Sequence, residues 1–448
     1  MSSVVTQTVR PLPVDAEKDT KAGNYFISNY PPFSFWTPER LHEVYEALDT
    51  PAPADRPLGL YVHIPFCRRR CHFCYFKVYT DRNAGQIKQY TDAVISELSL
   101  YAQRPFLNNR KPQFIYFGGG TPSYLSAAQL KDLTDGLKAV LPWDAAQEIA
   151  FEAEPGTLNE KKLAAIRQMG VTRLSLGVEN FSDHILSTNN RAHESKQVFS
   201  AYQSARNIDF PQINIDLISG MLGETEGNWI QNIRQTIDLS PDCVTIYQME
   251  VPFNTGIYHQ MKAEGKLVAP VADWDTKRRW VKYAFEQLQA AGYTVTSAYT
   301  AVKNPDKTKF LYRDSLWTGA DMIATGVASF GHINGTHYQN EKNIDLYIQI
   351  VNQGTLPIHR GMKITPEESM IRQLVLQLKL GRVSVDYFRR QFGVDIRQRF
   401  ADVLGKYQKA GFLKVEGEWI TLERDTLLQV DAMLPEFFLP QHRTNRIA

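Results

Sequence analysis

Short apolar runs alternate with helical patterns over more than half of the chain, and no other feature of the sequence constrains the fold as strongly. Each apolar run predicts a buried strand, and apolar residues at three- and four-residue spacing between the runs predict helices. The predicted strands span residues 58–64, 114–117, 149–153, 173–177, 212–217 and 244–249. About six strand–helix units in succession imply a parallel sheet, because each right-handed crossover needs a covering helix. Fewer than eight units favour a partial (β/α)6 barrel over a closed barrel, so we predict an α/β fold of that kind.

Local signals predict where some of the helices begin and end. Thr157 and Glu160 have the spacing of a capping box ahead of a helix predicted at 163–169, and Gly170 is expected to end that helix. Near the C-terminus, the apolar pattern over 396–410 predicts one continuous helix.

The character of the sequence changes on both sides of the alternating region. Residues 1–55 are predicted to form an N-terminal arm, whose aromatic patch at 30–36 is more typical of packing than of a lid over a ligand. The barrel is predicted for 56–300, followed by a segment at 301–360 that completes it on the substrate side. Residues 361–448 are predicted to form a C-terminal helical domain, which is winged-helix-like because a small hairpin follows the helices.

The charge of the chain excludes some classes of partner. Its 448 residues include 50 Lys and Arg against 48 Asp and Glu, a net charge of +2 at pH 7. So small an excess argues against a dedicated nucleic-acid binder. No apolar run approaches the ~20 residues of a membrane span, and residues 1–23 lack the apolar segment of a secretory signal. We therefore expect a cytoplasmic protein with no membrane span and no nucleic-acid partner, and we expect it to be a monomer.

Three of the four cysteines lie close together, directly after the first predicted strand, at Cys67, Cys71 and Cys74. A disulfide scaffold would use more cysteines and spread them along the chain, whereas clustered thiols in a reducing compartment are typical of metal or redox chemistry. Thiolates with the spacing C-x-x-x-C-x-x-C can hold three irons of a 4Fe-4S cluster and leave the fourth iron open. A structural zinc ion with His63 or His72 as fourth ligand is the alternative.

The segment 61–67, together with this cysteine spacing, resembles the radical S-adenosylmethionine enzymes, in particular their oxygen-independent coproporphyrinogen III oxidase-like branch. The likeness extends from about Tyr30 to the C-terminal helices. It implies a partial barrel of the radical SAM type, a 4Fe-4S cluster on the three cysteines, and S-adenosylmethionine as one molecule or two. It also implies that an electron from the cluster cleaves the bound S-adenosylmethionine to a 5′-deoxyadenosyl radical.

A run of three glycines, Gly118, Gly119 and Gly120, follows the second predicted strand and precedes Thr121. Glycines allow the backbone to approach a ligand closely, although a simple turn explains such a run equally well. The spacing differs from that of a dinucleotide-binding motif. By resemblance to the family, this segment holds the methionine end of S-adenosylmethionine.

Further polar residues lie at the ends of predicted strands and match cofactor-contacting positions of the family. Each has an ordinary polar residue as its alternative, but ligands gather at the C-terminal ends of parallel strands. The resemblance implies cofactor contacts for Tyr61, Glu152, Glu179, Arg191 and Asp216. It also implies a catalytic role for Tyr61, Glu179 and Arg191, and Glu179 stands where relatives often have Gln.

One position departs from the best-known members of the branch. Coproporphyrinogen oxidases carry a further cysteine two residues after the third one, and here that position is Phe76. Phe at this position is similar to the heme chaperone-like proteins and to the class C radical SAM methyltransferases and cyclopropanases. By contrast, segments within 312–361 resemble the coproporphyrinogen oxidase-like branch, and by that likeness Tyr338 and Asn340 are expected to face the substrate.

Three functions are therefore predicted. We favour C-methyl transfer or cyclopropanation of a porphyrin-like or other aromatic substrate. The alternatives are oxidative decarboxylation of coproporphyrinogen III in porphyrin and heme biosynthesis, and a heme-binding chaperone. The implied partners are a small aromatic or tetrapyrrole substrate and an electron donor such as flavodoxin or ferredoxin. Such a donor could meet Arg68, Arg69 and Arg70 of the cysteine loop, whose alternative is a solvated basic loop.

Overall fold

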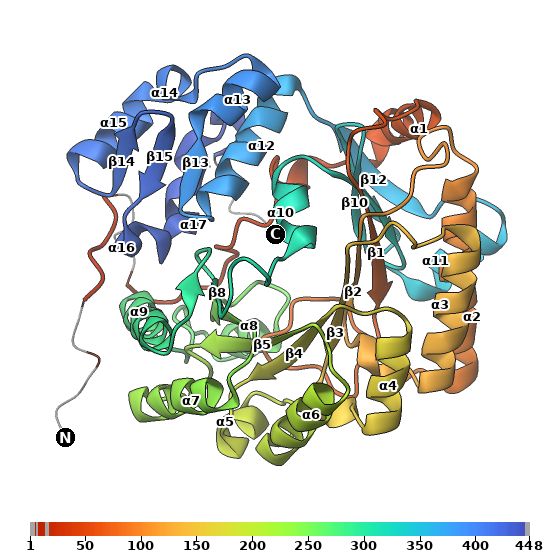
Figure 1. The fold of residues 1–448 in the computed structure, drawn as a ribbon, viewed down its shortest axis with the longest axis horizontal. Helices are drawn as coiled ribbons and strands as arrows, with labels where there is room; N and C mark the ends of the chain where they lie inside the picture. Colours follow the sequence, from red (N-terminus) through yellow and green to blue (C-terminus); the bar gives the residue numbers. More distant parts are fainter. Residues whose placement is uncertain (1–4, 6–7, 14–17, 444–448) are drawn as a thin grey trace.

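The computed structural model describes residues 5, 8–13 and 18–443, and its centre is a curved sheet of twelve strands. The strand order is β12-β11-β10-β9-β1-β2-β3-β4-β5-β6-β8-β7 (Figure 1). The strands β1 to β6 run parallel to one another, and they comprise β1 (Leu58–Ile64), β2 (Phe114–Gly119), β3 (Glu148–Ala153), β4 (Arg173–Glu179), β5 (Gln212–Ser219) and β6 (Cys243–Gln248). Because the order ends at β12 and β7 without joining them, the described sheet is an open part of a barrel, and the predicted α/β fold is confirmed.

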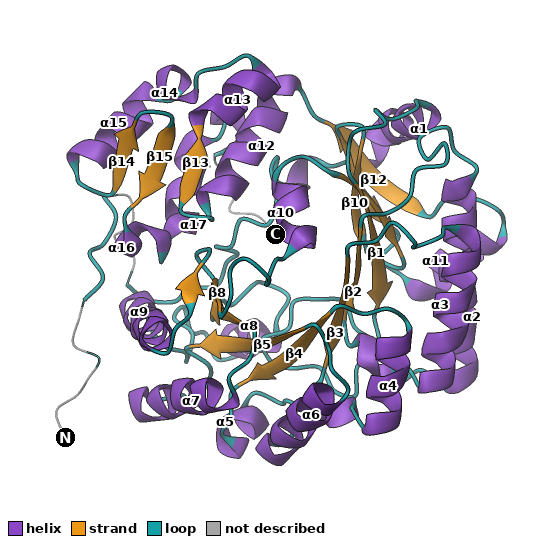
Figure 2. Ribbon diagram, viewed as in Figure 1, coloured by secondary structure: helices purple, strands orange, loops and turns teal. Residues whose placement is uncertain are grey.

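Helices form the connections between these strands and cover the outer side of the sheet (Figure 2). They are α2 (Ala84–Ala102), α3 (Ala127–Val140), α4 (Glu160–Gln168), α5 (Asp183–Thr188), α6 (Ser195–Asn207), α7 (Glu226–Leu239) and, after β6, α9 (Trp274–Ala290). Helix α8 (Gly256–Ala263) lies instead beside the cysteine loop, where the Ile257 N–H donates to the His72 carbonyl. The packing of their apolar stripes against the sheet explains the alternation in the sequence, since a parallel sheet needs cover over its crossovers.

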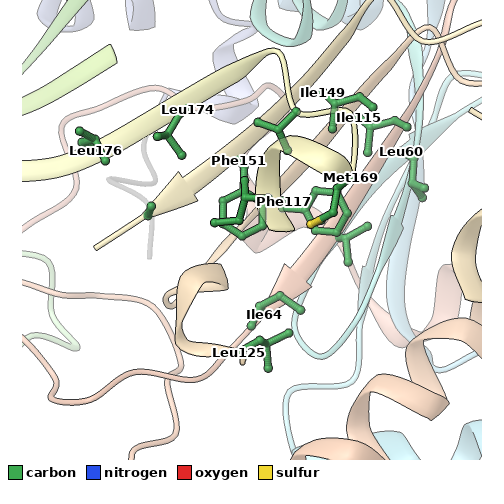
Figure 3. Close-up of a cluster of buried hydrophobic side chains, with 14 of the residues drawn as sticks. Leu60, Ile64, Ile115, Phe117, Leu125, Ile149, Phe151, Met169, Leu174 and Leu176 are labelled. Carbon is green, nitrogen blue, oxygen red and sulfur yellow. The ribbon is translucent and has the colours of Figure 1, made fainter. Parts of the chain in front are cut away.

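Successive residues of a strand point to opposite sides of the sheet, and this separates the core from the site. Alternate residues such as Leu60, Ile115, Phe117, Phe151 and Leu174 point outward and are buried in the main hydrophobic cluster (Figure 3). Each such side chain contributes roughly 1.5–3 kcal/mol by leaving water. The remaining residues of the same strands face the inside of the curve, where polar and aromatic side chains predominate.

The sheet continues beyond the six parallel strands on both sides. On one side the added strands are β9 (Asp321–Thr325), β10 (Phe330–Ile333), β11 (Thr336–Asn340) and β12 (Ile358–Lys363), and on the other β7 (Thr294–Val295) and β8 (Thr300–Val302). Strand β9 pairs in parallel with β1, whereas β10, β11 and β12 are antiparallel. Helix α10 (Leu311–Trp317) lies inside the curve, and α11 (Ile344–Asn352) lies outside it (Figure 1). The alternating pattern predicted no strand over 301–360, because these strands are short and all but β9 are antiparallel.

The C-terminal part contains a small three-stranded sheet with the order β13-β15-β14. Its elements are α12 (Pro366–Leu378), β13 (Arg382–Ser384), α13 (Val385–Phe392), α14 (Ile396–Arg399), α15 (Ala401–Lys409), β14 (Leu413–Glu416), β15 (Trp419–Leu422), α16 (Arg424–Leu427) and α17 (Val430–Met433). The single helix expected over 396–410 is wrong, since Phe400 leaves the helical conformation (φ −120°, ψ 31°) and separates α14 from α15.

The N-terminal arm packs on the other parts of the molecule. Leu12, Ile27 and Tyr30 are buried in the same hydrophobic cluster as the C-terminal helices. Trp36 is buried as well and stacks on His337 of β11, with ring centroids 4.7 Å apart. These aromatic side chains therefore act in packing, ahead of the short helix α1 (Leu41–Asp49).

The predicted capping box at Thr157 and Glu160 is wrong. The N-cap of α4 is Asn159, whose side chain accepts a hydrogen bond from the backbone N–H of Lys162. The Thr157 hydroxyl instead donates to the carbonyl oxygen of Glu154. Gly170 follows the helix with a positive φ of 95°, as a residue that ends a helix should.

Candidate functional site

The cysteine loop leaves β1 and is fixed at its base by backbone hydrogen bonds. The Cys67 N–H donates to the Tyr79 carbonyl (3.1 Å), and the Tyr79 N–H donates to the Pro65 carbonyl (2.8 Å). Cys71 and Cys74 lie within the loop, where the Cys74 N–H donates to the Cys71 carbonyl. All three cysteines are free thiols, and they are close enough to influence each other's ionisation.

The surroundings of Cys67 and Cys74 make these two thiols hard to ionise without a cation. Burial is the main cause: together with the charges of the other two cysteines it raises the pKa of Cys67 to about 12, and together with the charge of Cys71 it raises the pKa of Cys74 to about 11. Two groups lower these two pKa values: the Thr121 hydroxyl, which lies 3.3 Å from Cys67 Sγ, acts on Cys67, and the positive charge of Arg191 acts on Cys67 and Cys74. Arg191 Nη1 itself lies 3.4 Å from Cys71 Sγ. Coordination to a metal deprotonates such thiols, so the loop is chemically suited to iron.

The three glycines lie where β1, β2 and the cysteine loop pack closely against one another. Gly119 has a φ of +115°, and a Cβ there would come within 2.6 Å of the His63 ring. A Cβ at Gly120 would lie 3.0 Å from Cys67 Sγ, and one at Gly118 would lie 2.7 Å from the Tyr116 ring. Packing within the protein thus accounts for all three glycines. Contact of this segment with S-adenosylmethionine stays a prediction.

Glu152 lies at the end of β3 and faces the inside of the curve. Its carboxylate accepts hydrogen bonds from the Tyr116 hydroxyl (2.6 Å) and from the Gly119 N–H (3.2 Å). Burial, with further contributions from the negative charges of Asp216 and Glu179, raises the pKa of Glu152 to about 7. This carboxyl group therefore changes its charge near neutral pH, which is typical of residues in functional sites.

Glu179 and Arg191 form an ion pair above β4. The register of β4 against β5 shifts between Gly177 and Glu179, and Glu179 has a φ of +63°, an unfavourable value for this residue type. Arg191 Nη2 lies 3.5 Å from Glu179 Oε1 and also donates to the Gly177 carbonyl (2.5 Å). The bulge thus aims the Glu179 carboxylate at Arg191, which connects it to Cys71. Burial raises the pKa of Glu179 to about 7, against the opposing charge of Arg191.

Asp216 and Tyr61 complete the group of predicted residues on the inner face. Asp216 accepts hydrogen bonds from Ser175 Oγ (2.7 Å) and Asn214 Nδ2 (2.9 Å), and burial raises its pKa. The Tyr61 ring stacks beside Tyr116 with centroids 5.9 Å apart, and its hydroxyl lies 3.2 Å from His63 Nδ1. The structure therefore places Tyr61, Glu152, Glu179 and Asp216 on β1, β3, β4 and β5, with Arg191 beside Glu179.

Two residues expected to face the substrate do not do so. Tyr338 and Asn340 are fully buried behind the sheet. The Tyr338 hydroxyl accepts a hydrogen bond from the Ala324 N–H, and Asn340 Nδ2 donates to Glu97 (2.6 Å). Both side chains lie between β11 and α2, where they contact residues of that helix, so they are structural residues.

Other residues at this site were given no cofactor contact from the sequence. Tyr116 lies on the inner face of β2 two residues before Gly118, and the strand pattern could have identified it. His63, named only as a possible zinc ligand, lies on the inner face of β1 two residues after Tyr61. Tyr75, Tyr247 and Glu250 lie on the cysteine loop and at the end of β6, and the Tyr75 phenol is within electrostatic reach of Glu152 and Glu250. No motif assigned a role to these three residues, so only the tertiary structure identifies them.

Two buried polar atoms of the site fit the carboxylate of a chelating ligand beside the thiols. Arg191 Nε and His63 Nε2 are buried, and neither has a hydrogen-bond partner in the described part of the chain. An unpaired guanidinium N–H next to Cys71 is a suitable donor for a carboxylate. Across residues 5, 8–13 and 18–443, no group of three or more His, Cys, Asp or Glu side chains is arranged to hold a single metal ion. In an iron–sulfur cluster, by contrast, each thiolate binds a different iron.

Comparisons with known proteins match two parts of the chain to families. Residues 61–235 match the radical SAM superfamily, and residues 364–425 match the HemN C-terminal domain. The heme chaperone HemW of Bacillus subtilis strain 168 is 29% identical over 355 residues, which is 79% of this chain and 92% of that protein. The oxygen-independent coproporphyrinogen III oxidase of Escherichia coli strain K12 is 26% identical over 405 residues, 86% of this chain and 87% of that enzyme.

A solved structure is similar over nearly the whole chain. It is that of coproporphyrinogen III oxidase (HemN) from Escherichia coli, described as a radical SAM enzyme, with a TM-score of 0.80 and 24% identity over 92% of this chain and 96% of that one. This likeness supports the fold. The relatives above are oxidases and chaperones, so they lend no support to the methyl transfer or cyclopropanation that we favoured from the sequence. Within the described residues, no helix is long and apolar enough to span a membrane.

Proposed function

Because this chain belongs to the radical SAM superfamily, in its oxygen-independent coproporphyrinogen III oxidase-like branch, we propose that it is an enzyme that oxidises a porphyrinogen-like tetrapyrrole. The cofactors of the superfamily are a 4Fe-4S cluster and S-adenosylmethionine. Together they supply a reductive cleavage that yields a hydrogen-abstracting radical. The proposal does not depend on whether one or two S-adenosylmethionine molecules bind.

The observation that carries this proposal is the convergence of the three thiols with Glu152, Arg191 and Asp216 at one end of the sheet. Cys67, Cys71 and Cys74 would hold the cluster. Arg191, with an unpaired Nε and a contact to Cys71, is placed to receive the carboxylate of a chelating amino acid. The acidic groups of Glu152 and Asp216 favour the positive charge and the N–H and O–H donors of S-adenosylmethionine.

The remaining residues would orient the ligand and keep water away. The Tyr61 and Tyr116 rings form a stacked apolar surface at the level of Glu152, and Tyr312 of α10 packs on Tyr116 with centroids 4.3 Å apart. The first residues of α10 are fixed to β3, because Glu148 accepts hydrogen bonds from the N–H groups of Leu311 and Tyr312. Packed aromatic rings of this kind limit the access of water to the reacting atoms.

A second candidate function is heme binding by a chaperone. Phe76 occupies the position where coproporphyrinogen oxidases have a cysteine, and the HemW relative is slightly more identical to this chain than the oxidases are. In this case the same apolar surfaces would bind a heme, and cleavage of S-adenosylmethionine would be negligible.

Anaerobic reconstitution of the full chain with iron and sulfide tests the two candidates. For an oxidase, we expect 5′-deoxyadenosine to form with dithionite and S-adenosylmethionine, and coproporphyrinogen III to lose mass as carbon dioxide is released. Equimolar heme binding without deoxyadenosine would favour the chaperone. Formation of S-adenosylhomocysteine beside deoxyadenosine, or the absence of iron from the three thiols, would contradict the proposal.

A further inference from the structure

The segment between the first two cysteines contains a run of three arginines, to which the proposed function gives no role. Arg68, Arg69 and Arg70 are all exposed to solvent, and so is His72. Residues 67–80 contain no Asp or Glu, although the chain as a whole has 48 acidic residues. Since the net charge of the chain is only +2, the run is a local concentration of positive charge.

The backbone under these arginines is fixed to three segments that follow different strands. Arg68 Nη1 donates to the Gly156 carbonyl (2.9 Å), which follows β3. Arg70 Nη2 donates to the Asn254 carbonyl (2.7 Å), which follows β6, and the Arg70 carbonyl accepts from Asn190 Nδ2 (2.8 Å), beyond β4. A surface held in this way loses little conformational entropy when a partner binds.

Few acidic groups neutralise these cations. Glu154 Oε2 lies 4.0 Å from Arg68 Nη1, and Glu154 itself is buried. Among the residues whose positions the structure describes, none forms an ion pair or a hydrogen bond with the Arg69 side chain. The segments 189–193 and 253–259, on which the loop packs, contain no acidic residue either. The positive charge is therefore available to a partner.

The arginines also lie next to the thiols that would hold the cluster. Arg69 is two residues from Cys67 and two residues from Cys71, so its Cα lies within about 7 Å of the Cα of either cysteine. Cys71 and Cys74 are only half-buried. Because the rate of electron transfer falls steeply with distance, a redox protein bound to this part of the loop would be well placed to exchange an electron with the cluster.

We propose that Arg68, Arg69 and Arg70, together with His72 and Phe253, form a docking surface for an acidic protein that carries one electron at a time. Phe253 precedes Asn254 and is 43% exposed, and arginine and aromatic side chains are enriched at protein interfaces. Interfaces of electron carriers are small, and complementary charge mainly raises the rate at which the partners associate. A few cations around one aromatic ring fit such a transient partner.

This inference rests on the proposed function, because reductive cleavage of S-adenosylmethionine consumes one electron, which a partner must supply. The carrier gives up one electron to the cluster and is itself oxidised by one electron. No bond forms or breaks at the docking surface.

The test uses the full chain with its cluster reconstituted, and reduced flavodoxin, an acidic one-electron carrier, as the probe. Stopped-flow absorbance measures the second-order rate constant for reduction of the cluster. We expect Arg69→Ala to lower this constant about 2- to 5-fold and Arg69→Glu to lower it about 5- to 20-fold, because reversal of the charge replaces attraction by repulsion. The difference from the wild type should shrink as the salt concentration rises.

Two controls isolate the position of the charge. Lys409→Glu makes the same change of net charge at the end of α15, where Lys409 is exposed, and should leave the rate constant within about 2-fold of the wild type. Formation of 5′-deoxyadenosine with excess dithionite should be unchanged in Arg69→Glu, since a small reductant needs no docking surface.

The outcomes separate this inference from the proposed function. A wild-type rate constant in Arg69→Glu, or an equal loss in Lys409→Glu, would overturn the docking surface and leave the oxidase standing if dithionite still drives the reaction. Slower reduction in Arg69→Glu, in a protein that forms no 5′-deoxyadenosine, would support the surface and contradict the oxidase. The iron content is recorded for every variant, and if Arg69→Glu loses the cluster, Arg69→Ala decides.

Discussion

Replacement of Glu152 by Gln should weaken cofactor binding and, at the same time, stabilise the free protein at alkaline pH. Glu152 Oε1 and Oε2 accept hydrogen bonds from Tyr116 and Gly119, and the pKa of this carboxyl is raised from 4.5 to about 7 by burial. A glutamine can keep both contacts, because its amide N–H can donate to the Tyr116 hydroxyl while its oxygen accepts from Gly119. The substitution therefore removes the charge with little change in shape.

The sign of the stability effect follows from linkage. The folded protein holds the Glu152 proton more tightly than the unfolded chain, so the contribution of this group to stability is complete below pH 4.5 and is lost as the pH rises through about 7. At about 1.4 kcal/mol per pH unit, the rise in the pKa from 4.5 to about 7 corresponds to about 3.5 kcal/mol at most. Since part of the side chain is open to solvent, we expect about 1–2 kcal/mol. Glutamine does not titrate, so Glu152→Gln should be the more stable protein above pH 7.

The same substitution should weaken the binding of S-adenosylmethionine. Loss of a charged hydrogen-bond acceptor costs roughly 1.5–3 kcal/mol, or about 10- to 150-fold in the Kd for S-adenosylmethionine. Urea unfolding at pH 5.5 and pH 8.5 measures stability, and calorimetric titration of the reconstituted protein with S-adenosylmethionine measures binding. If the variant binds the cofactor as the wild type does, or is destabilised equally at both pH values, the assignment of Glu152 to the site is refuted.

Three further predictions concern the cluster, a buried carboxyl and the core. Cys71→Ala should abolish iron binding and the visible absorbance of the reconstituted protein, with an unchanged circular dichroism spectrum; full iron content would contradict the cluster assignment. Burial raises the pKa of Glu97 to about 8, despite its hydrogen bonds from Tyr347, Gly326 and Asn340. Wild-type stability should thus fall as the pH rises through about 8, and Glu97→Gln should flatten that profile in urea titrations; an equal slope in both proteins would refute this cause. Phe117→Ala should lower the free energy of unfolding by about 3–5 kcal/mol, and a loss below 1 kcal/mol would show that the packing in Figure 3 does not govern stability.

The sequence by itself determined the parallel part of the fold and the position of the thiols. In strands such as Leu58–Ile64 and Gln212–Ser219, apolar residues that face the core alternate with residues that face the inside of the curve, and that signal is local. The cysteine spacing is local as well, since it lies within one loop. Sheet topology then required the residues at the ends of these strands to meet at one edge. That requirement brought Glu152, Glu179 and Asp216 together.

Only the tertiary structure decided which side chains face the open end of the barrel and which are buried behind it. Tyr338 and Asn340 belong to segments that resemble the coproporphyrinogen oxidase-like branch, yet β11 turns them toward Glu97 in the interior. No motif assigned a role to Tyr75 or Tyr247, yet two elements far apart in the chain bring both within electrostatic reach of Glu152. The direction of a side chain depends on strand register and on neighbours distant in sequence, and a periodic pattern of single residues does not encode either of these.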